Sequence, residues 1–308
     1  MARTAKQACL IINGKSAQNP QLREAVTNLR ERGHRIDVNV TWEQGDGARF
    51  AKQAGRHGVE RLIVGGGDGT VHEVVNGLME LDRAQRPAIG VIPLGSANDL
   101  ASSLEIPLEP QAALETALAA APCWVDVPSL NDQYFINMVS GGFGAEITSS
   151  TPKTLKSLLG GGAYSLMGML NAWRYKPYSG RLRWEGGECD VPLFLLAIGN
   201  GSQAGGGQRV APAAKLNDGL VDVLIVRDYE TLPGMKRMLD EFDAMDETIS
   251  LPYSGEFIDY VQTSWLSFES DTALPLTLDG EFNHHARFEI RMNREALRLL
   301  APASCVLL

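Results

Sequence analysis

Long apolar runs are missing from this chain of 308 residues, and so is any excess of positive charge. No window reaches the roughly 18 apolar residues that a membrane-spanning helix needs, so we expect no transmembrane segment. The first nine residues carry charges but no apolar stretch of signal-peptide length. The net charge of −9 argues against nucleic acid as a partner, because nucleic-acid binders rely on a positive field. We therefore expect a cytoplasmic protein whose contact with a membrane is at most peripheral.

Cysteine is scarce, and its spacing follows no metal-binding pattern. The four cysteines stand at positions 9, 123, 189 and 305, which favours reduced thiols of a cytosolic protein over a disulfide framework. Low-complexity tracts and internal repeats are also absent, so the chain should fold throughout. At 308 residues the chain exceeds what one core comfortably organises, and two domains are expected.

The most informative segment that is present runs from Gly65 to Thr70 and reads GGGDGT. It follows the apolar residues 62–64 and precedes a helical pattern that starts at Val71. Glycine loses much backbone entropy on ordering, but its bare N–H groups can approach an anion closely at the start of a helix. The segment predicts a phosphate-binding loop, against the alternative of an ordinary strand-to-helix turn. Asp68 would repel a phosphate unless a cation or a hydroxyl lies between them.

Two familiar phosphate motifs do not fit this segment. The dinucleotide fingerprint GxGxxG, started at Gly65, needs glycine where Thr70 stands, which disfavours a dehydrogenase. A Walker loop ending in Gly14, Lys15 and Ser16 would place its first glycine on Cys9, inside an apolar strand.

The first 130 residues alternate strand and helix patterns, which predicts a Rossmann-like three-layer α/β domain with a parallel sheet. The expected strands are residues 8–12, 35–40, 61–64, 88–92 and 124–127, and the expected helices are residues 21–32, 44–56, 70–81, 97–104 and 111–121. Gly14, Thr41, the glycine loop and the segment 94–99 follow strands, so they should gather at one edge of the sheet.

Residues 131–292 are richer in short β patterns, which predicts an antiparallel β-sandwich-like domain. The expected strands are residues 134–139, 181–184, 193–198, 220–226, 257–268, 274–278 and 288–292, with helices near 164–173 and 232–242. The Asp-Gly pairs at 218–219 and 279–280 are hairpin signals. The path of residues 296–301 is open, because they could return to the first domain and complete it with residues 293–308.

Four motifs in this order resemble the bacterial diacylglycerol-kinase-like lipid kinases, and among them the YegS type. They are GGDGT at 66–70, PLGSAND at 93–99, the stretch from the glycines 205–207 through Asp218 and Leu220, and LDGE at 278–281. The resemblance covers nearly the whole chain. It implies an ATP-binding domain at 1–130, a lipid-substrate domain at 131–292, and ATP with Mg²⁺ in the cleft between them.

The resemblance also assigns roles residue by residue. Glu281 matches the general base that takes the proton of the lipid hydroxyl. Independently of the resemblance, the tight turn at 279–280 would fix Asp279 and Glu281 as an acid/base pair or as cation ligands, against the alternative of a plain hairpin turn. The chemistry of phosphoryl transfer then assigns Asp68, with Asp279, to Mg²⁺ or its waters. A second divalent-cation site, for Mg²⁺ or Ca²⁺, would use Lys215, Asp218 and Leu220, two of them through main-chain oxygens. Nucleotide contacts fall on Thr41, Gly66, Gly67, Asp68, Gly69, Thr70, Val71, His72, Glu73 and Ser96.

Two of these positions depart from the family's usual residues. Ser96 replaces a threonine and keeps its hydroxyl. His72 replaces an asparagine, and an ordinary helix-surface residue is the favoured interpretation of it.

The segment 151–184 contains no Asp or Glu, although the whole chain is acidic. Its basic residues are Lys153, Lys156, Arg174, Lys176, Arg181 and Arg183, and its aromatic residues are Tyr164, Trp173, Tyr175, Tyr178 and Trp184. Basic side chains favour an anionic leaflet, and Trp and Tyr favour the headgroup level. The segment predicts peripheral contact with an anionic membrane, against the alternative of a core helix with solvated basic flanks.

Together these features indicate an ATP- and Mg²⁺-dependent kinase that phosphorylates a hydroxyl of a glycerolipid, with phosphatidylglycerol and diacylglycerol as candidates. One alternative is a soluble-substrate kinase of the NAD-kinase type. Another is a non-catalytic module that senses a nucleotide or a lipid, although clustered carboxylates near a phosphate disfavour it.

Overall fold

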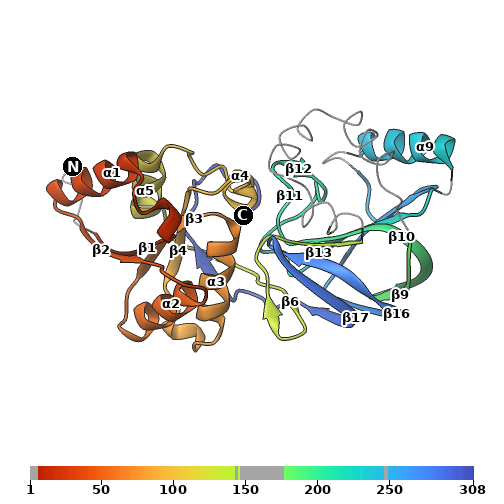
Figure 1. Ribbon diagram of the computed structural model, residues 1–308, viewed down its shortest axis with the longest axis horizontal. Helices are drawn as coiled ribbons and strands as arrows, with labels where there is room; N and C mark the ends of the chain where they lie inside the picture. Colours follow the sequence, from red (N-terminus) through yellow and green to blue (C-terminus); the bar gives the residue numbers. More distant parts are fainter. Residues whose placement is uncertain (1–5, 143–144, 146–176, 230, 246–248) are drawn as a thin grey trace. The chain divides into compact units, whose positions relative to one another are not determined.

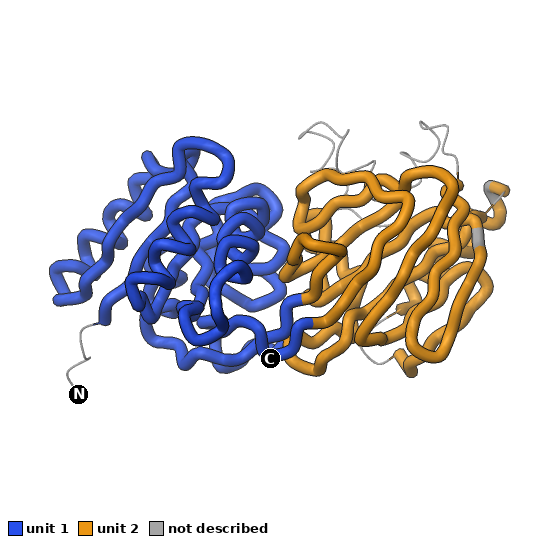
Figure 2. Tube along the Cα trace, turned by 90° about the horizontal axis from the view of Figure 1, so that it is seen from below, with its two compact units in different colours: residues 1–127, 293–308 blue, residues 128–292 orange. Residues whose placement is uncertain are grey.

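A computed structural model describes residues 6–142, 145, 177–229, 231–245 and 249–308 of the chain. It divides into two compact units, one spanning residues 1–127 and 293–308 and the other residues 128–292 (Figure 2). The end of the chain, whose path the sequence left open, therefore belongs to the first unit.

The first unit contains a sheet of six described strands in the order β2-β1-β3-β4-β18-β5. Every neighbouring pair is parallel except β18 and β5. The strands are β1 (Gln7–Ile12), β2 (Arg35–Val40), β3 (Arg61–Gly66), β4 (Ala88–Pro93), β5 (Cys123–Val125) and β18 (Leu297–Leu299). In β3 and β4 nearly every residue is buried, as expected for central parallel strands covered on both faces.

Helices cover both faces of this sheet, with α1 and α5 on one side and α2 and α3 on the other (Figure 1). The helices are α1 (Pro20–Glu31), α2 (Asp46–Arg56), α3 (Asp68–Met79), α4 (Asp99–Ser103) and α5 (Pro110–Ala119). In α3 the buried residues Val71, Val74, Val75 and Leu78 recur at the spacing of one helix face. This face packs on the sheet and fixes where the N-terminus of α3 lies.

The second unit contains a larger antiparallel sheet with the strand order β14-β15-β13-β10-β8-β16-β17-β6-β7. The long strands β10 and β16 each pair with β9 along one part and with β8 along another. The strands are β6 (Ser129–Leu130), β7 (Gln133–Tyr134), β8 (Met138–Gly142), β9 (Tyr178–Trp184), β10 (Gly187–Gly199), β13 (Val221–Arg227), β14 (Tyr253–Ser254), β15 (Ile258–Thr263), β16 (Trp265–Leu278) and β17 (Glu281–Arg291). The short strands β11 (Gln203–Ala204) and β12 (Gln208–Arg209) form a separate pair.

The strand β13 of this sheet is buried on both faces. Along β13, Val221, Val223 and Ile225 contribute to one apolar cluster, and the alternating residues Leu224 and Val226 contribute to another. The helix α9 (Leu232–Asp243) packs in the second cluster. The two units confirm the predicted fold class, an α/β domain followed by a β-sandwich-like domain.

Two local predictions for the second unit were wrong. Asp218 and Gly219 do not form a hairpin turn, because the chain runs from them into β13, whose partners are β10 and β15. The expected strand 257–268 is two strands, β15 and β16, and β15 pairs with β13 whereas β16 pairs with β17. The expected helix at 164–173 lies outside the described residues.

Two expectations about the whole chain concern cysteines and membrane spans. All four cysteines are free. Among the described residues, no helix has the length and apolar character needed to cross a bilayer.

Candidate functional site

The glycine segment joins a buried strand to a helix, as predicted. The strand β3 ends at Gly66, and α3 begins at Asp68 with Gly67 as its N-cap residue. The helices α1, α5 and α9 are capped by side chains of Asn19, Glu109 and Thr231, but Gly67 offers no side chain to α3. The first turn of α3 therefore presents backbone donors without a side-chain cap from its own N-cap residue, which suits an anionic ligand.

Glycine is required at two positions of this edge because two loops touch. A Cβ atom on Gly95 would lie 2.5 Å from the Cα atom of Gly67, and one on Gly67 would lie 3.0 Å from the Cα atom of Gly95. Gly95 is further held by Asn98, whose Oδ1 accepts its N–H at 2.8 Å. The loops after β3 and β4 thus meet backbone to backbone, as predicted from their positions at strand ends.

Asn13, which was not among the residues predicted from the sequence, fixes the hydroxyl of Thr70. Its Nδ2 donates to Oγ1 of Thr70 at 3.0 Å, and its own backbone N–H donates to the carbonyl of Gly65 at 2.8 Å. Asn13 directly follows β1. A polar residue in that place, directly after a buried parallel strand, is a signal from which the sequence could have identified it. It links the end of β1 to the glycine loop.

Thr41 lies at the end of β2 and contacts the loop after β1. Its Oγ1 accepts the N–H of Gly14 at 3.2 Å, and a Cβ atom on Gly14 would lie 2.4 Å from the Thr41 carbonyl oxygen. The predicted nucleotide residues Thr41 and Thr70 thus both contact the residues that follow β1. Thr41 contacts Gly14, and Thr70 contacts Asn13.

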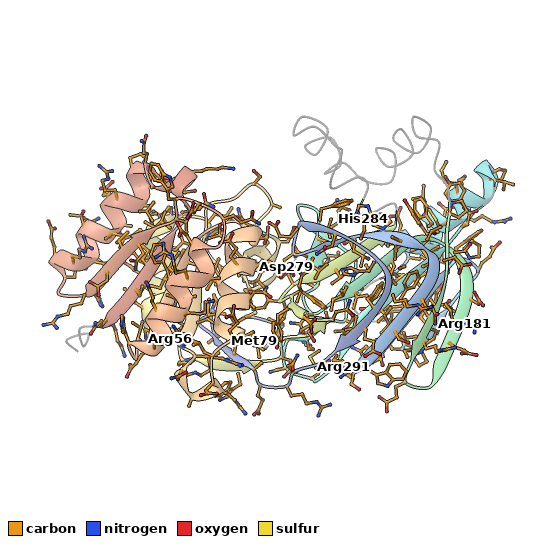
Figure 3. The ribbon with its side chains drawn as sticks, turned by 60° about the horizontal axis from the view of Figure 1, so that its bottom comes forward. Arg56, Met79, Arg181, Asp279, His284 and Arg291 are labelled. Carbon is orange, nitrogen blue, oxygen red and sulfur yellow. The ribbon has the colours of Figure 1, made fainter. Side chains whose placement is uncertain are left out.

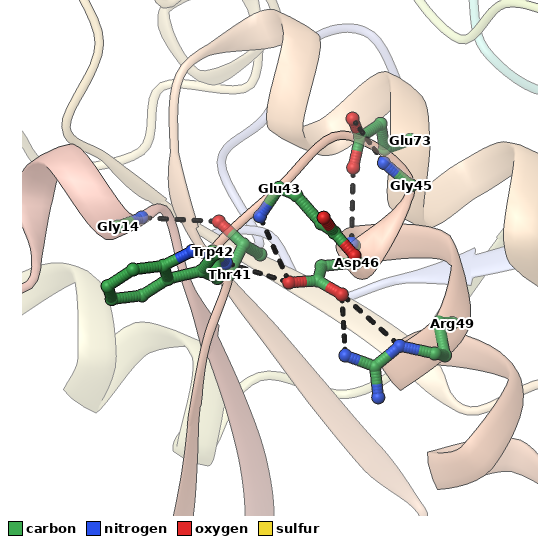
Figure 4. A network of polar contacts seen from close by, with 9 residues as sticks. Gly14, Thr41, Trp42, Glu43, Gly45, Asp46, Arg49 and Glu73 are labelled. Atoms are coloured by element: carbon green, nitrogen blue, oxygen red, sulfur yellow. Dashed lines mark hydrogen bonds and ion pairs between the residues drawn. The ribbon is translucent and has the colours of Figure 1, made fainter.

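Two carboxylates of α3 cap the neighbouring helices. Glu73 accepts the N–H groups of Gly45 and Gly47, at 3.2 and 3.1 Å, where α2 begins (Figure 4). Asp68 accepts the N–H of Leu100 in α4 at 3.3 Å. Both residues were predicted as nucleotide or cation contacts, and these bonds give each a structural task as well.

The loop between β2 and α2 is held by the buried carboxylate of Asp46. It accepts the N–H of Trp42 at 2.7 Å and of Glu43 at 3.2 Å, and it pairs with Arg49 (Figure 4). The amide of Trp42, followed by Arg49 and the amide of Glu43, lowers the pKa of Asp46 to about 2. The loop that carries Thr41 is therefore fixed before any ligand binds.

The other predicted nucleotide residues differ in their exposure to solvent and in the hydrogen bonds that their backbone groups already make. Val71 is buried, and its N–H and that of Thr70 both donate to the Gly67 carbonyl. His72 is half-buried on α3, where its carbonyl accepts a bond from Asn76. Gly69 is half-buried, and Ser96 is exposed in the loop after β4. Backbone atoms of Gly66 and Gly67 line the same edge.

In the second unit, Asp279 and Gly280 form the two-residue turn between β16 and β17, as predicted. Both have positive φ, 48° and 94°, the conformation of a type I′ turn. The Asp279 carboxylate (Figure 3) is buried and accepts the N–H groups of Ile136, Asn137 and Met138, at 2.9, 3.0 and 3.0 Å. These bonds assign Asp279 a structural task and argue against the cation-binding role inferred from the turn.

Glu281 follows this turn as the first residue of β17 and is exposed. Its carboxylate makes no hydrogen bond or ion pair with other described residues. The position combines a rigid backbone with an accessible carboxylate, which suits a general base.

Lys215, Asp218 and Leu220 lie in one loop before β13. Oδ1 of Asp218 accepts the N–H of Leu220 at 2.9 Å, which folds this loop around the carboxylate. Behind it, buried Asp222 accepts bonds from Tyr260, at 2.6 Å, and from Gln262. Burial raises the pKa of Asp222 to about 7, although the bonds from Tyr260 and Gln262 oppose that rise.

Most of the predicted membrane segment, 151–184, lies outside the described residues. Arg181 and Arg183 are within them, on β9, and they pair with Asp190 and Glu188 of β10 at 2.8 and 3.4 Å. These two basic residues thus have acidic partners across the strand pair, which the sequence count did not anticipate.

Within the described part of the chain, no group of three or more His, Cys, Asp or Glu side chains is placed to hold a metal ion. The oxygen donors at the two predicted sites are instead single carboxylates, Asp68 and Asp218, beside main-chain groups. Hard cations such as Mg²⁺ and Ca²⁺ accept such oxygen ligands together with water or phosphate.

An α/β unit with a glycine-lined sheet edge, followed by a β-rich unit, is the architecture of kinases of the diacylglycerol-kinase type. Residues 7–129 match the diacylglycerol kinase catalytic domain, and residues 137–301 match the YegS C-terminal NAD kinase beta sandwich-like domain. The chain belongs to the YegS-like family of probable lipid kinases.

Named relatives match along almost their whole length. A probable lipid kinase YegS-like protein of Chromohalobacter salexigens is 57% identical, over 97% of this chain and 94% of that one. One of Enterobacter sp. is 40% identical, over 99% of both chains. A putative diacylglycerol kinase structure from Bacillus anthracis has the same fold, with a TM-score of 0.79 at 24% identity over 99% of this chain and 100% of that one.

Proposed function

We propose that this protein is an ATP- and Mg²⁺-dependent lipid kinase that phosphorylates a hydroxyl of a glycerolipid, phosphatidylglycerol or diacylglycerol. The observation that carries the proposal is the glycine N-cap of α3. Gly67 leaves the first turn of that helix without a side-chain cap, and it meets Gly95 backbone to backbone. Family membership supports the assignment of this edge to the phosphates of ATP.

The transfer needs positioning and charge neutralisation more than covalent help. Backbone N–H groups at the start of α3 bind the phosphates of ATP. Glu281 accepts the proton of the lipid hydroxyl, whose oxygen then forms a bond to the γ-phosphorus. The bond from that phosphorus to the β–γ bridging oxygen breaks, and ADP leaves with the electron pair. A positioned base of this kind contributes roughly 10²- to 10⁴-fold to the rate.

Asp68 is the residue we assign to Mg²⁺, directly or through a water. It is half-buried at the N-terminus of α3, where a carboxylate next to phosphates needs a cation between them. When bound, the ion neutralises charge on the phosphates. The loop with Lys215, Asp218 and Leu220 is proposed as a second divalent-cation site, which stabilises the approach to β13.

A lipid acceptor is favoured over a soluble one by two observations. The named relatives are probable lipid kinases. The acid-free sequence 151–184 combines basic and aromatic residues, a composition that suits an anionic membrane surface. We propose that this segment brings the protein to the membrane without spanning it.

The test is phosphoryl transfer from γ-labelled ATP, with Mg²⁺, to a bacterial lipid extract in detergent. We expect label in the organic phase at the position of a phosphorylated glycerolipid. Asp68→Ala should abolish this label. Asp68→Asn is the matched control for structure, because its amide oxygen can still accept the N–H of Leu100.

Other outcomes of this transfer experiment would favour one of the alternative functions or contradict the role of Asp68. Label that stays in the aqueous phase as a phosphorylated small molecule would point to a soluble acceptor. ATP binding without any transfer would favour the sensing module. Equal transfer by wild type and Asp68→Ala would contradict the role of Asp68.

A further inference from the structure

Trp42 is the most exposed large apolar side chain among the described residues, with 94% of its surface accessible. It directly follows Thr41, and its loop is fixed at several points. Its N–H donates to buried Asp46 at 2.7 Å, and the following residues are held through the bond of Gly45 to Glu73. In Figure 4 the indole extends from the loop on the side of Gly14, away from Arg49. A large aromatic surface is thus presented to solvent by a rigid loop.

The position of Trp42 along the sheet edge is specific. The strand order β2-β1-β3 places Trp42 after β2, Gly14 after β1 and the glycine cap after β3. Two strand spacings of about 4.8 Å separate the ends of β3 and β2. An extended nucleoside triphosphate whose phosphates lie at α3 can span that distance with its base.

The path toward β2 is open at Gly14, which has no side chain and is exposed. The opposite direction, toward β4, is closed by the contact between Gly67 and Gly95. Among the first two residues after each described strand of this sheet, Trp42 is the aromatic one. The open path at Gly14, the closed path toward β4 and the position of Trp42 together direct the base toward β2.

We propose that the indole of Trp42 stacks on the base of the bound nucleotide, so that Trp42 is a base-recognition residue. This inference rests on the proposed function, since it assumes that phosphates bind at the start of α3. Aromatic side chains stack on nucleobases with little loss of side-chain freedom, and a preorganised loop reduces the ordering cost further. In this arrangement Trp42 contacts only the base, and the start of α3 at Gly67 binds the phosphates.

The experiment measures calorimetric binding of Mg²⁺-ATP and of Mg²⁺-tripolyphosphate, which has no base, to the full chain. Trp42→Ala should weaken ATP binding by roughly 5- to 150-fold, the loss expected when a stacking partner is removed. Tripolyphosphate binding should stay within about twofold of wild type. Trp42→Phe should recover most of the ATP affinity because its ring can still stack. Trp265→Ala, which removes another exposed tryptophan on β16, is the control and should bind ATP normally.

Three results would overturn the inference. Unchanged ATP binding by Trp42→Ala would exclude stacking while leaving the kinase proposal intact. Equal weakening of ATP and tripolyphosphate would show that Trp42 acts on the loop instead of the base. Failure of wild type to bind either ligand would refute the proposed nucleotide site, and the inference with it.

Because Trp42 is almost fully exposed, its replacement should leave the melting temperature unchanged.

Discussion

Oδ1 of Asp279 accepts the backbone N–H of Asn137 at 3.0 Å, although 142 residues separate them in the chain. The same carboxylate accepts the N–H groups of Ile136 and Met138. The tip of the β16–β17 hairpin is thereby tied to the start of β8. This tie fixes the backbone next to Glu281, so we interpret Asp279 as the residue that positions the proposed base.

Replacing Asp279 should therefore destabilise the second unit. Asp279→Ala leaves three backbone N–H groups without their acceptor, and each buried unsatisfied group costs about 1–3 kcal/mol. We expect the free energy of unfolding to fall by roughly 3 kcal/mol or more. Asp279→Asn should lose less, because asparagine tolerates positive φ and retains one oxygen. Urea unfolding followed by circular dichroism checks this, and equal stability of Asp279→Ala and wild type would show that the tie is unimportant.

Glu281→Gln should separate catalysis from binding. The side chain is exposed, so we expect the melting temperature and the ATP dissociation constant to stay at wild-type values. Turnover should fall by roughly 10²- to 10⁴-fold because the amide cannot accept the proton. The measurement is steady-state transfer from labelled ATP to lipid in detergent. Near-full turnover would mean that another group is the base.

Gly95→Ala should damage the edge where the loops after β3 and β4 meet. The new Cβ atom would lie 2.5 Å from the Cα atom of Gly67, so one loop must move, at a cost of roughly 1–3 kcal/mol. We expect lower stability and weaker ATP binding. Gly65→Ala is the matched control, because its nearest neighbour, Cδ1 of Leu94, is at an ordinary 3.4 Å. If both variants bind ATP equally, the close approach is not needed for the site.

The buried carboxyl of Asp222 should make stability depend on pH. Its pKa is raised from 3.8 to about 7, so between these values the folded chain holds a proton that the unfolded chain has released. The resulting stability is present in full below the lower value and is lost as the pH rises through about 7. Asp222→Asn is neutral throughout and lacks this loss.

The free energy of unfolding of Asp222→Asn, relative to wild type, should therefore increase between pH 4 and 8. The full shift corresponds to an increase on the order of 4 kcal/mol. Urea unfolding at several pH values measures it. A difference between the two proteins that does not change with pH would contradict the raised pKa.

Charge reversal tests the membrane segment. Changing Lys153, Lys156, Arg174 and Lys176 to Glu should weaken sedimentation with anionic vesicles, because each basic residue near the surface contributes about 1 kcal/mol. ATP binding should not change. The charge-matched control changes four exposed basic residues elsewhere, Arg23, Arg35, Arg56 and Lys236. Equal loss in both variants would indicate a net-charge effect, and no loss in either would remove the segment from membrane contact.

The first unit was the more predictable because its strands and helices alternate regularly along the chain. The expected strands 35–40 and 88–92 match β2 and β4 to within one residue. The start of α3 was placed two residues late, at 70 instead of 68, because glycine and aspartate are poor helix formers. In the second unit, the break at Ser264 separates β15 from β16. No glycine or proline marks that break, and only tertiary pairing reveals it.

At the site, sequence identified the glycine loop but not the side chains that hold it. The bonds from Asn13 to Thr70 and from the N–H of Gly45, at the start of α2, to Glu73 join positions 57 and 28 residues apart. A local pattern cannot reveal such contacts, because they depend on strand order. The turn at Asp279 and Gly280 was correctly predicted for the opposite reason, since its conformation is determined by those two residues alone.

The strand β18 lies between β4 and β5 in the first sheet. During synthesis, residues 297–299 leave the ribosome only after the whole second unit has been made. Until then β4 can pair only with β3, and its other edge has no partner strand. The first unit, although its synthesis starts first, is therefore completed last, after every residue of the second unit has been made.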